Sequence, residues 1–408
     1  MSLDSRPPVA DDACAAATRA VRAGIDGDPC WGAVTPPLVL SSNFSFAGFG
    51  EKRAYDYTRS GNPTRDLLGD ALARLEGGAG GVVTATGMAA ITLLLHAMLE
   101  PGDRLVVPHD AYGGSWRLFD ALARKGHFEL VTADLTDPRA LAMALSRGPK
   151  LVLVETPSKP LLRVTDLRFV IDAAHRAGAR VAVDNTFLSP ALQTPIAFGA
   201  DVVLHSTTKY INGHSDFVGG AVIARDAELH AQLAWWANAL GITGSPFDSF
   251  LTLRGLRTLD ARIRVHQENA GVLARRLHGH PAVARVYWPG LEAHPGHGIA
   301  ARQQKGFGAM LSVELHGGEE AVRAFIDGLR CFTLAESLGG VESLIAHPAT
   351  MTHAAMTPEA RARAGISDGL LRLSIGIEAC ADLQADLDAA LARAEAAATA
   401  AGRRQVDA

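Results

Sequence analysis

A short stretch in the middle of the chain combines residue types that can hold a phosphorylated cofactor. Residues 202–204 (VVL) form a continuous apolar run, which predicts a buried parallel strand. Ser206, Thr208 and Lys209 follow it directly, and ligands of open α/β sheets bind at the carboxyl ends of such strands. The two hydroxyls can hold a phosphate and the Lys209 amine can form a Schiff base, so the stretch favours pyridoxal 5'-phosphate (PLP).

Lys209 alone does not define a cofactor site, because most lysines in proteins are solvated surface charges. PLP also needs an acid for its ring nitrogen, a face to stack on and a cup for its phosphate. Asp184 ends the apolar run 181–183, where a carboxylate requires a nearby cation or hydrogen-bond donor. A pyridinium nitrogen would supply one, and a structural aspartate that caps a turn is the alternative.

A second phosphate-binding signal lies earlier, at Thr86-Gly87-Met88, between a predicted strand at 81–84 and a predicted helix at 89–99. A helix amino terminus offers free backbone N–H groups and a dipole that favours phosphate. Helices that begin with a glycine are common, so this signal is weak by itself. The turn contains no GxGxxG, which argues against a dinucleotide site.

The elements that must position these residues alternate between strand and helix. An amphipathic helix over 68–75 ends at a glycine pair. Strands are then expected at 81–84, 105–107, 129–131, 151–155, 180–183, 202–204 and 219–223, with helices at 89–99, 117–125, 138–146 and 167–177 and another that contains Trp235 and Trp236. This alternation predicts a doubly wound α/β domain with a mainly parallel sheet.

The pattern changes near residue 257. A long helix over about 260–279 leads to a smaller α+β domain, with strands near 283–287, 309–315 and 370–375 and helices near 319–329 and 381–399. Arg372 lies inside the last of these strands, between apolar residues. A half-buried arginine implies a carboxylate partner, either from the protein or from a substrate.

The amino-terminal part is less regular. Residues 1–20 are expected to be disordered or loosely docked. Residues 32–46 are rich in turn formers and aromatics and predict an extended arm. The polar loop at 55–65 (YDYTRSGNPTR) carries two arginines and two tyrosines, and its spacing alone favours a surface loop.

Composition narrows the class of protein. The chain has 408 residues, of which 48% are hydrophobic and 20% charged, as in an ordinary globular protein with two or three domains. The net charge of -4 gives no basic footprint for nucleic acid. No apolar run of about 18 residues predicts a membrane span, and the first residues lack the apolar core of a signal peptide. The four cysteines are scattered without CxxC spacing, so neither a metal site nor a disulfide framework is expected, and the sequence favours a cytoplasmic enzyme.

The motifs together resemble the Cys/Met-metabolism PLP-dependent enzymes, which have the aspartate-aminotransferase-type fold. The resemblance covers about residues 20–395 and rests on the loop 55–65, on ATGM at 85–88, DNTF at 184–187, the Lys209 stretch at 201–215, ESLGGVESL at 336–344 and TMTH at 350–353. It implies a PLP-dependent transferase of fold type I, with a seven-stranded, mainly parallel sheet domain at 61–257 and an α+β domain at 258–408. It also implies a homotetramer of tight dimers, in which the arm at 1–60 contributes to the neighbouring subunit's site.

The resemblance assigns roles to individual residues. Lys209 would hold PLP, Asp184 would pair with the ring nitrogen and Tyr112 would stack on the ring. The phosphate would be held by Gly87, Met88, Ser206 and Thr208, with Tyr57 and Arg59 reaching in from the neighbouring subunit, so the resemblance overturns the surface-loop interpretation. Arg372 and the backbone near Ser337 would bind the substrate α-carboxylate, Glu336 belongs to a region that separates synthases from lyases, and Asn238 and Arg117 would line the distal pocket.

Two positions depart from the family pattern. The family has Ser-Asn-Pro where this chain has Ser158-Lys159-Pro160, and that asparagine usually bonds the PLP 3'-oxygen. Ser60 follows Arg59 where some relatives carry a second arginine for the distal substrate carboxylate. These departures affect the polarisation of the cofactor and the choice of acyl group.

The resemblance implies a γ-replacement, in which O-succinylhomoserine or O-acetylhomoserine reacts with L-cysteine to give L-cystathionine and succinate or acetate, a transsulfuration step of methionine biosynthesis. A γ-lyase that splits cystathionine, or a related sulfhydrylase, is the alternative within the family. A non-catalytic PLP-binding regulator is the alternative from another class, and only Lys159 suggests it.

Overall fold

The computed structural model describes residues 14–25, 27, 28, 30–352, 354, 361 and 364–406. Residues 1–13 of the segment expected to be loosely docked, and His353 of the TMTH motif, lie outside this range. The chain forms two compact units. Unit 1 contains residues 1–108, 118–155 and 167–260, and unit 2 contains residues 109–117, 156–166 and 261–408.

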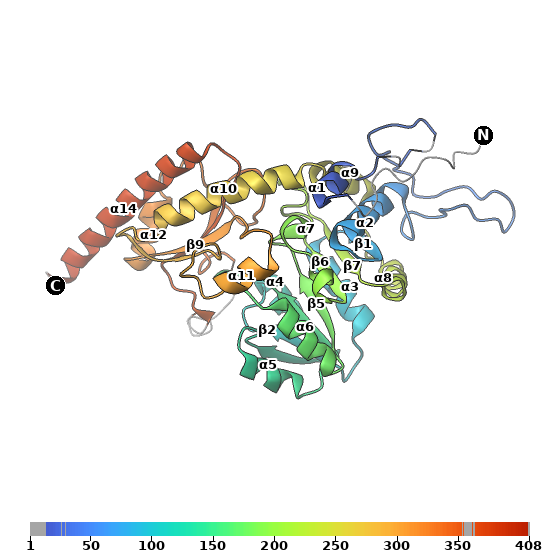
Figure 1. Cartoon of the computed structure of the whole chain (residues 1–408), viewed down its shortest axis with the longest axis horizontal. Helices are drawn as coiled ribbons and strands as arrows, with labels where there is room; N and C mark the ends of the chain where they lie inside the picture. The colour runs from blue at the N-terminus through green and yellow to red at the C-terminus, as the bar shows by residue number, and fades with distance from the viewer. Residues whose placement is uncertain are drawn as a thin grey trace. The chain divides into compact units, whose positions relative to one another are not determined.

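Unit 1 is built on a seven-stranded sheet with the order β1-β7-β6-β5-β4-β2-β3 (Figure 1). Neighbouring strands from β3 to β6 run parallel, and β7 runs antiparallel to both β6 and β1. The predicted seven-stranded, mainly parallel sheet is therefore confirmed. Its strands are β1 (Gly80–Thr84), β2 (Arg104–Pro108), β3 (Glu129–Ala133), β4 (Leu151–Glu155), β5 (Arg180–Asp184), β6 (Val202–His205) and β7 (Gly220–Ala224).

Two adjacent glycines show that helices cover both faces of this sheet. Successive residues of a strand point to opposite faces. A Cβ on Gly81 would lie 2.5 Å from the Gly69 carbonyl oxygen of α2 (Pro63–Glu76), whereas a Cβ on Gly80 would lie 2.5 Å from the His230 ring of α8 (Ala227–Leu240). Glycine at both positions lets the two helices approach the edge strand closely from either side.

Of the remaining helices, α3, α4, α5 and α6 follow the predicted alternation, whereas α1, α7, η1 and α9 were not predicted. Apolar residues of β2 to β5 pack with α5 and α6 in a buried core cluster. A short helix over 16–21 corrects the expectation of disorder for that part of residues 1–20, because Ala20 is buried. These helices are α1 (Ala16–Val21), α3 (Gly87–Met98), α5 (Pro138–Leu145), α6 (Leu167–Arg176), α7 (Ser189–Leu192), η1 (Pro195–Phe198) and α9 (Pro246–Leu256). Helix α4 (Gly113–Arg124) belongs to unit 2 as far as Arg117 and to unit 1 from Leu118.

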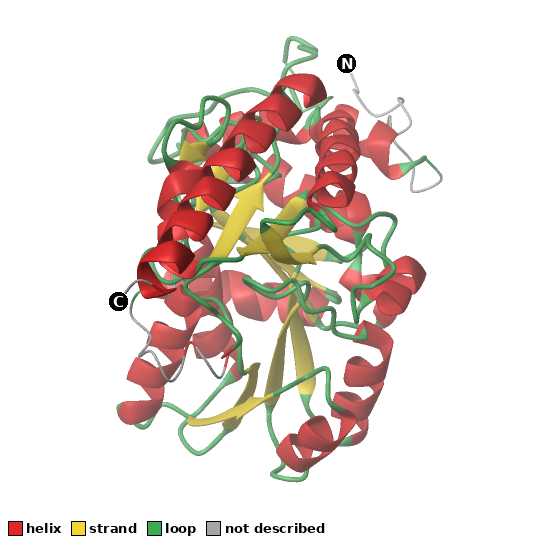
Figure 2. Cartoon of the chain, turned by 90° about the vertical axis from the view of Figure 1, so that its left-hand side faces the viewer, coloured by secondary structure: helices red, strands yellow, loops and turns green. Residues whose placement is uncertain are grey.

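Unit 2 contains a five-stranded sheet with the order β10-β11-β12-β9-β8, and Figure 2 shows its strands in yellow and its helices in red. The strands are β8 (Val283–Tyr287), β9 (Met310–Leu315), β10 (Thr333–Leu334), β11 (Leu344–Ala346) and β12 (Leu370–Ser374). The helices are α10 (Leu259–Leu277), α11 (His297–Gln303), α12 (Gly318–Ile326) and α14 (Cys380–Val406). Sequence patterns predicted β8, β9 and β12 but not the short strands β10 and β11.

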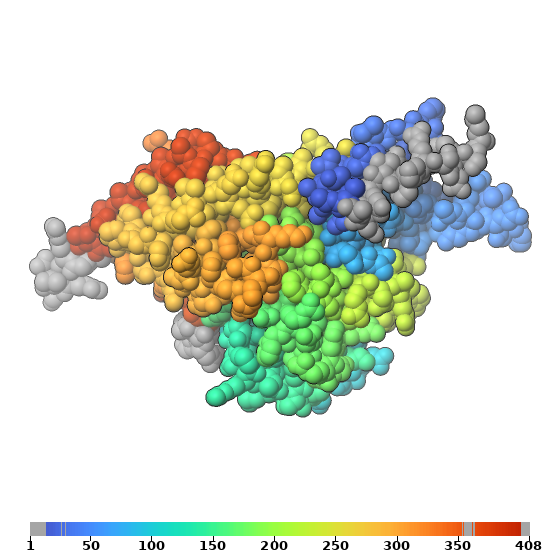
Figure 3. All heavy atoms as spheres, in the orientation of Figure 1, coloured from blue at the N-terminus to red at the C-terminus, as the bar shows by residue number. Residues whose placement is uncertain are grey.

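The segment between α1 and α2 forms the expected arm. It folds back on itself through an isolated bridge between Asn43 and Tyr57 and a hydrogen bond from the Thr58 N–H to the Ser42 carbonyl (2.9 Å). Figure 3 shows this blue segment projecting from the rest of unit 1. Trp31 and Phe49 on the arm are fully or almost fully exposed. Among the described residues, no helix is long and apolar enough to cross a membrane.

Candidate active site

The predicted phosphate-binding residues meet where the start of α3 approaches the residue that follows β6. The Thr86 side chain caps α3 by accepting a hydrogen bond from the Ala89 N–H (2.9 Å). The N–H groups of Gly87 and Met88 belong to the first turn, which has no acceptor within the helix. A Cβ on Gly87 would lie 2.8 Å from the Ser206 Cβ, so glycine is needed for this approach. Two backbone donors and a hydroxyl therefore meet at a positive helix end, which suits an anionic phosphate.

Hydrogen bonds to the backbone fix the neighbouring polar residues. Thr208 Oγ1 accepts from the Gly219 N–H (3.0 Å), which ties the turn after β6 to the start of β7. Thr186 accepts from the Ser206 N–H (2.9 Å) through its hydroxyl, while its own N–H donates to Asp184 Oδ1 (3.0 Å). Asp184 is thus connected to Ser206 across two adjacent strand ends.

Lys209 lies in the turn that follows β6. Its N–H donates to the Ser206 carbonyl (3.2 Å), and its carbonyl accepts from the Gly213 N–H (2.8 Å). Asp184 pairs with Leu204 in the register of β5 and β6, so Asp184 and Lys209 lie at the same carboxyl edge of the sheet. An acid, a lysine and a phosphate cup at one edge match the three parts of PLP: its ring nitrogen, its aldehyde and its phosphate. The residues of unit 1 therefore fit this cofactor.

A buried acid beneath this edge was missed from the sequence. Glu76, the last residue of α2, accepts through Oε1 from Asn185 Nδ2 (2.8 Å) and contacts His205 Nε2 (2.6 Å). The Glu76 and His205 side chains are completely buried. Asn185 follows Asp184 and His205 precedes Ser206, so one carboxylate oxygen joins the two strand ends that carry the predicted site. Little in the sequence indicates this role, because Asn185 and His205 lie more than a hundred residues from Glu76.

The loop 55–65 is anchored by the start of α2. Asn62 caps the helix by accepting from the Thr64 N–H (3.0 Å), and its amide donates to the Val39 carbonyl (3.0 Å) of the arm. Burial is the main cause that lowers the pKa of the Arg65 guanidinium and raises the pKa of Tyr55 to about 12. Both side chains therefore serve to hold the loop from inside.

Two of the predicted residues meet within one chain. Arg59 Nη1 donates to both the carbonyl and the side-chain oxygen of Asn238, each at 2.8 Å. The Arg59 guanidinium also lies 5.6 Å from the centre of the exposed Tyr57 ring. That Tyr57 and Arg59 contribute to the cofactor site of a neighbouring subunit remains a prediction.

In unit 2, Arg372 is buried in β12 and holds an unusual backbone. Its Nη2 donates to the Ser337 carbonyl (2.8 Å). Ser337 has a φ of 80°, a left-handed conformation that costs a residue with a side chain about 1–3 kcal/mol and is often found at ligand sites. The neighbouring Glu336 is exposed. The structure thus brings the two predicted carboxylate-binding groups, Arg372 and the backbone at Ser337, together.

Tyr112 and Arg117 also belong to unit 2. The Lys159 ammonium, which stands where the family has asparagine, lies 5.3 Å from the centre of the Tyr112 ring. An ammonium over an aromatic face is attracted by the ring's quadrupole. Lys159 therefore contacts the side chain that is predicted to stack on PLP. Arg117 is exposed and forms no ion pair with any described residue.

A family comparison agrees with this arrangement. A family model described as Cys/Met metabolism PLP-dependent enzyme matches residues 17–392. The chain belongs to this family, whose cofactor is PLP.

Individual relatives narrow the comparison. The cystathionine gamma-synthase of Escherichia coli (strain K12) is 59% identical over 372 residues, or 91% of this chain and 96% of the relative. Crystal structures of the cystathionine gamma synthase from Xanthomonas oryzae pv. oryzae, in complex with cystathionine or with aminoacrylate and cysteine, are 78% identical. They have a TM-score of 0.93 and cover 94% of this chain and 99% of their own. A cystathionine gamma-lyase of Dictyostelium discoideum is 44% identical over 375 residues, or 92% of this chain and 97% of the relative.

Proposed function

We propose that this enzyme catalyses the γ-replacement of O-succinylhomoserine or O-acetylhomoserine by L-cysteine, giving L-cystathionine and succinate or acetate. The observation that carries the proposal is the 78% identity, over 94% of the chain, to a cystathionine gamma synthase crystallised with cystathionine. The reaction is a transsulfuration step of methionine biosynthesis. The residues of unit 1 support it because they fit the PLP that such chemistry requires.

Each predicted cofactor contact has a physical task. Gly87, Met88, Ser206 and Thr208 hold the phosphate, and Asp184 keeps a proton on the ring nitrogen. When bound, PLP acts as an electron sink that stabilises negative charge on the carbon skeleton of the amino acid. The amine of Lys209, which would hold PLP in the absence of substrate, would accept the proton from Cα as a general base. Loss of a further proton from Cβ would expel the acyloxy group from Cγ as a carboxylate, and the cysteine thiolate would add at Cγ. Return of a proton to Cβ and to Cα would complete cystathionine.

In this proposal the substrate is bound by residues of unit 2 and by Asn238 of unit 1. Arg372 and the backbone at Ser337 take the α-carboxylate, because a buried guanidinium binds a carboxylate with charge-assisted hydrogen bonds. Tyr112 stacks on the ring, and Arg117 with Asn238 lines the distal pocket. Glu336 lies beside Ser337 in the region that separates synthases from lyases.

The γ-lyase alternative makes a different product, so one assay separates the two activities. We expect cystathionine when O-succinylhomoserine and cysteine are supplied, and little α-ketobutyrate when the enzyme is given cystathionine without cysteine. Release of α-ketobutyrate from cystathionine as the faster reaction would favour the lyase, which the 44% identical relative represents. The regulator alternative has no support from the relatives, since those named above are enzymes.

The acyl group is predicted from charge. Arg117 provides a cation for the distal carboxylate of a succinyl group. Ser60 stands where some relatives have an arginine, so this chain lacks the second cation that would strengthen a preference for succinyl. A charge-assisted contact is worth about tenfold to a hundredfold in kcat/KM, so we expect a moderate preference for succinyl over acetyl substrate. Arg117→Met should erase it by damaging succinyl turnover alone, and Ser60→Arg should enlarge it, as measured by kcat/KM for both substrates. Equal losses for both would mean that Arg117 positions Tyr112 or the cofactor instead.

We propose a homotetramer of tight dimers in the cytoplasm. The exposed Trp31 and Phe49 of the arm support burial against another copy, because large exposed aromatics mark interaction surfaces. The described cysteines, including Cys331 and Cys380, are free thiols, which supports a reducing compartment.

If Arg59 serves the neighbouring subunit, mixed dimers should regain activity. Inactive Lys209→Ala and Arg59→Ala proteins are unfolded, mixed and refolded so that subunits exchange, and hybrid formation is verified with two different affinity tags. Each hybrid dimer should then hold one site with both residues intact and recover roughly half of the wild-type activity per dimer, since the other site loses both. Hybrids without activity would mean that Arg59 acts within its own chain, where it bonds Asn238.

A further inference from the structure

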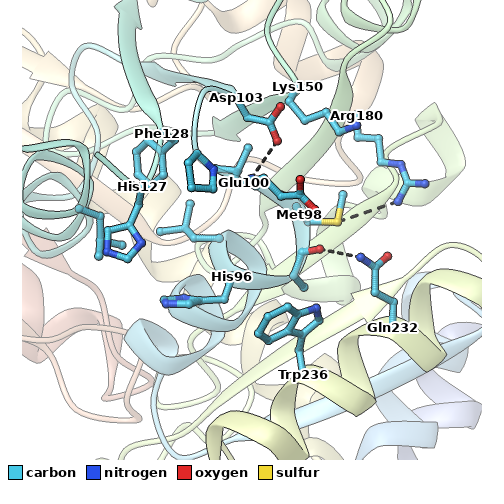
Figure 4. Close-up of a pocket in the computed structure, with 15 residues that line it drawn as sticks. His96, Met98, Glu100, Asp103, His127, Phe128, Lys150, Arg180, Gln232 and Trp236 are labelled. Atoms are coloured by element: carbon cyan, nitrogen blue, oxygen red, sulfur yellow. Dashed lines mark hydrogen bonds between the residues drawn. The ribbon is translucent and has the colours of Figure 1, made fainter. Parts of the chain in front are cut away.

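Unit 1 contains a cavity at the edge of the sheet opposite Lys209. It has a volume of about 560 Å³ and lies between the end of α3, the starts of β2, β4 and β5, and α8 (Figure 4). Small-molecule sites typically range from about 300 to 1,000 Å³. The cavity contains none of the residues assigned to PLP or to the substrate, so the proposed function does not account for it.

Charges of both signs line this cavity without neutralising one another. Lys150 and Arg180 stand at the starts of adjacent strands, and Glu100 and Asp103 lie on the loop after α3. Neither cation forms an ion pair with any described residue, and the polar contact of the Arg180 guanidinium is the Met98 sulfur at 3.9 Å. Asp103 accepts from the Glu100 N–H (2.9 Å).

A neighbouring position shows that charges here can pair. Arg104, at the start of β2, bonds Glu129 of β3 at 2.6 Å. The cavity cations, by contrast, have no ion pair with a described residue, although Glu100 and Asp103 line the same cavity. A ligand that carries a carboxylate and an ammonium would complement charges of both signs at once, which neither an anion nor a cation alone would do.

The rest of the lining is mostly apolar, with His96, His127 and Gln232 as its uncharged polar side chains. Met98, Leu99 and Phe128 are buried there, and the half-buried Trp236 packs edge-on against Trp235 with ring centres 5.1 Å apart. Gln232 bonds the Ala97 carbonyl (2.6 Å) and fixes α8 against α3 at this point. An apolar side chain of a ligand would bury its surface against these residues. The described residues bring no three potential metal ligands together, so a metal site is not the explanation.

We propose that this cavity binds a free α-amino acid with an apolar side chain. The carboxylate contacts Lys150 and Arg180, the ammonium contacts Glu100 and Asp103, and the side chain lies against Met98 and Trp236. This cavity is separate from the candidate site at Lys209. The proposal does not depend on which reaction occurs at Lys209.

The test uses calorimetric titration of the holoenzyme with L-norleucine after borohydride reduction, which fixes PLP on its lysine so that an amino acid cannot enter the active site by exchange. Hexanoate, without the ammonium, and hexylamine, without the carboxylate, serve as matched probes. We expect saturable binding of norleucine at millimolar concentrations and weaker binding of both probes. Absence of norleucine binding, or equal affinity for hexanoate, would overturn the proposal.

Charge-specific variants locate the site. Lys150→Met with Arg180→Met should weaken norleucine and hexanoate alike, by about tenfold for norleucine. Glu100→Gln should weaken norleucine and hexylamine but not hexanoate. Lys125→Met, an exposed cation outside the cavity, is the control and should change nothing. Norleucine binding that survives in all the cavity variants would show that the ligand binds elsewhere and would refute the assignment.

Discussion

Turnover should fall by at least about a thousandfold when Lys209 is replaced by alanine, the upper part of the range for removing a general base. The expected loss is large because one side chain both anchors the cofactor and moves the proton at Cα. Both roles are assigned to Lys209 because it lies in the turn after β6. The same edge of the sheet carries Asp184 and the close approach of Gly87 to Ser206. Steady-state formation of cystathionine measures the loss.

Peptide mapping gives a readout that does not depend on activity. After borohydride reduction of the holoenzyme, the PLP label should be found on the peptide that contains Lys209. Lys125→Ala, which removes an exposed lysine, should leave both labelling and turnover unchanged. A label on Lys159 or on any other lysine would refute the assignment, whatever the activity of the Lys209 variant.

The second large effect is expected on stability. Glu76→Ala removes the acceptor shared by Asn185 and His205, and the Glu76 and His205 side chains are completely buried. Removing one partner of a buried pair of ionisable side chains costs about 3–5 kcal/mol, because the polar groups left behind have no water to replace the lost contact. We expect the urea midpoint of the apoprotein to fall accordingly. Glu76→Gln keeps an oxygen acceptor and should lose less, about 1–3 kcal/mol.

Glu129 provides a matched control for Glu76. It contacts Arg104 at the same 2.6 Å, but its side chain is 50% exposed. An exposed ion pair contributes only about 0–1 kcal/mol, so Glu129→Ala should shift the midpoint little. Equal shifts for the two variants would show that burial of the Glu76 contact adds nothing to stability. The two carboxylates share a contact distance but differ in their partners, since Glu129 contacts an arginine whereas Glu76 contacts a histidine and an amide, so the comparison tests burial together with the partner.

The sheet was predictable because its strands are short continuous apolar runs bounded by turn formers. β4 and β6 are buried along their whole length, so their sequences show β-branched and aliphatic residues without alternation. β10 and β11 have only two and three residues, which is too few for any periodicity. α9 was missed because its apolar residues define a weak face, although Ser245 and Pro246 supply the expected cap and first position.

The candidate site was predictable only in part. Asp184 and Lys209 follow apolar runs directly, so the carboxyl edge could be deduced from chain order. The role of Glu76 could not be predicted, because an acid at the end of an amphipathic helix is usually a surface charge. Its two partners are also more than a hundred residues away in the sequence. The left-handed backbone of Ser337 was equally hidden, since the Arg372 guanidinium that bonds its carbonyl is 35 residues away in the sequence.

The place of β1 in the sheet has a consequence for biosynthesis. β1 hydrogen-bonds only to β7, with Gly80 opposite Ala224. On a ribosome that adds about 5–20 residues per second, β1 waits roughly 10–30 s for its partner strand to be synthesised. During that time an apolar edge is exposed to other nascent chains, and pairings so distant in sequence form slowly. Completion of the sheet, and with it the contact between Glu76 and His205, therefore belongs to a late stage of folding in which this chain is most prone to aggregation and most dependent on chaperones.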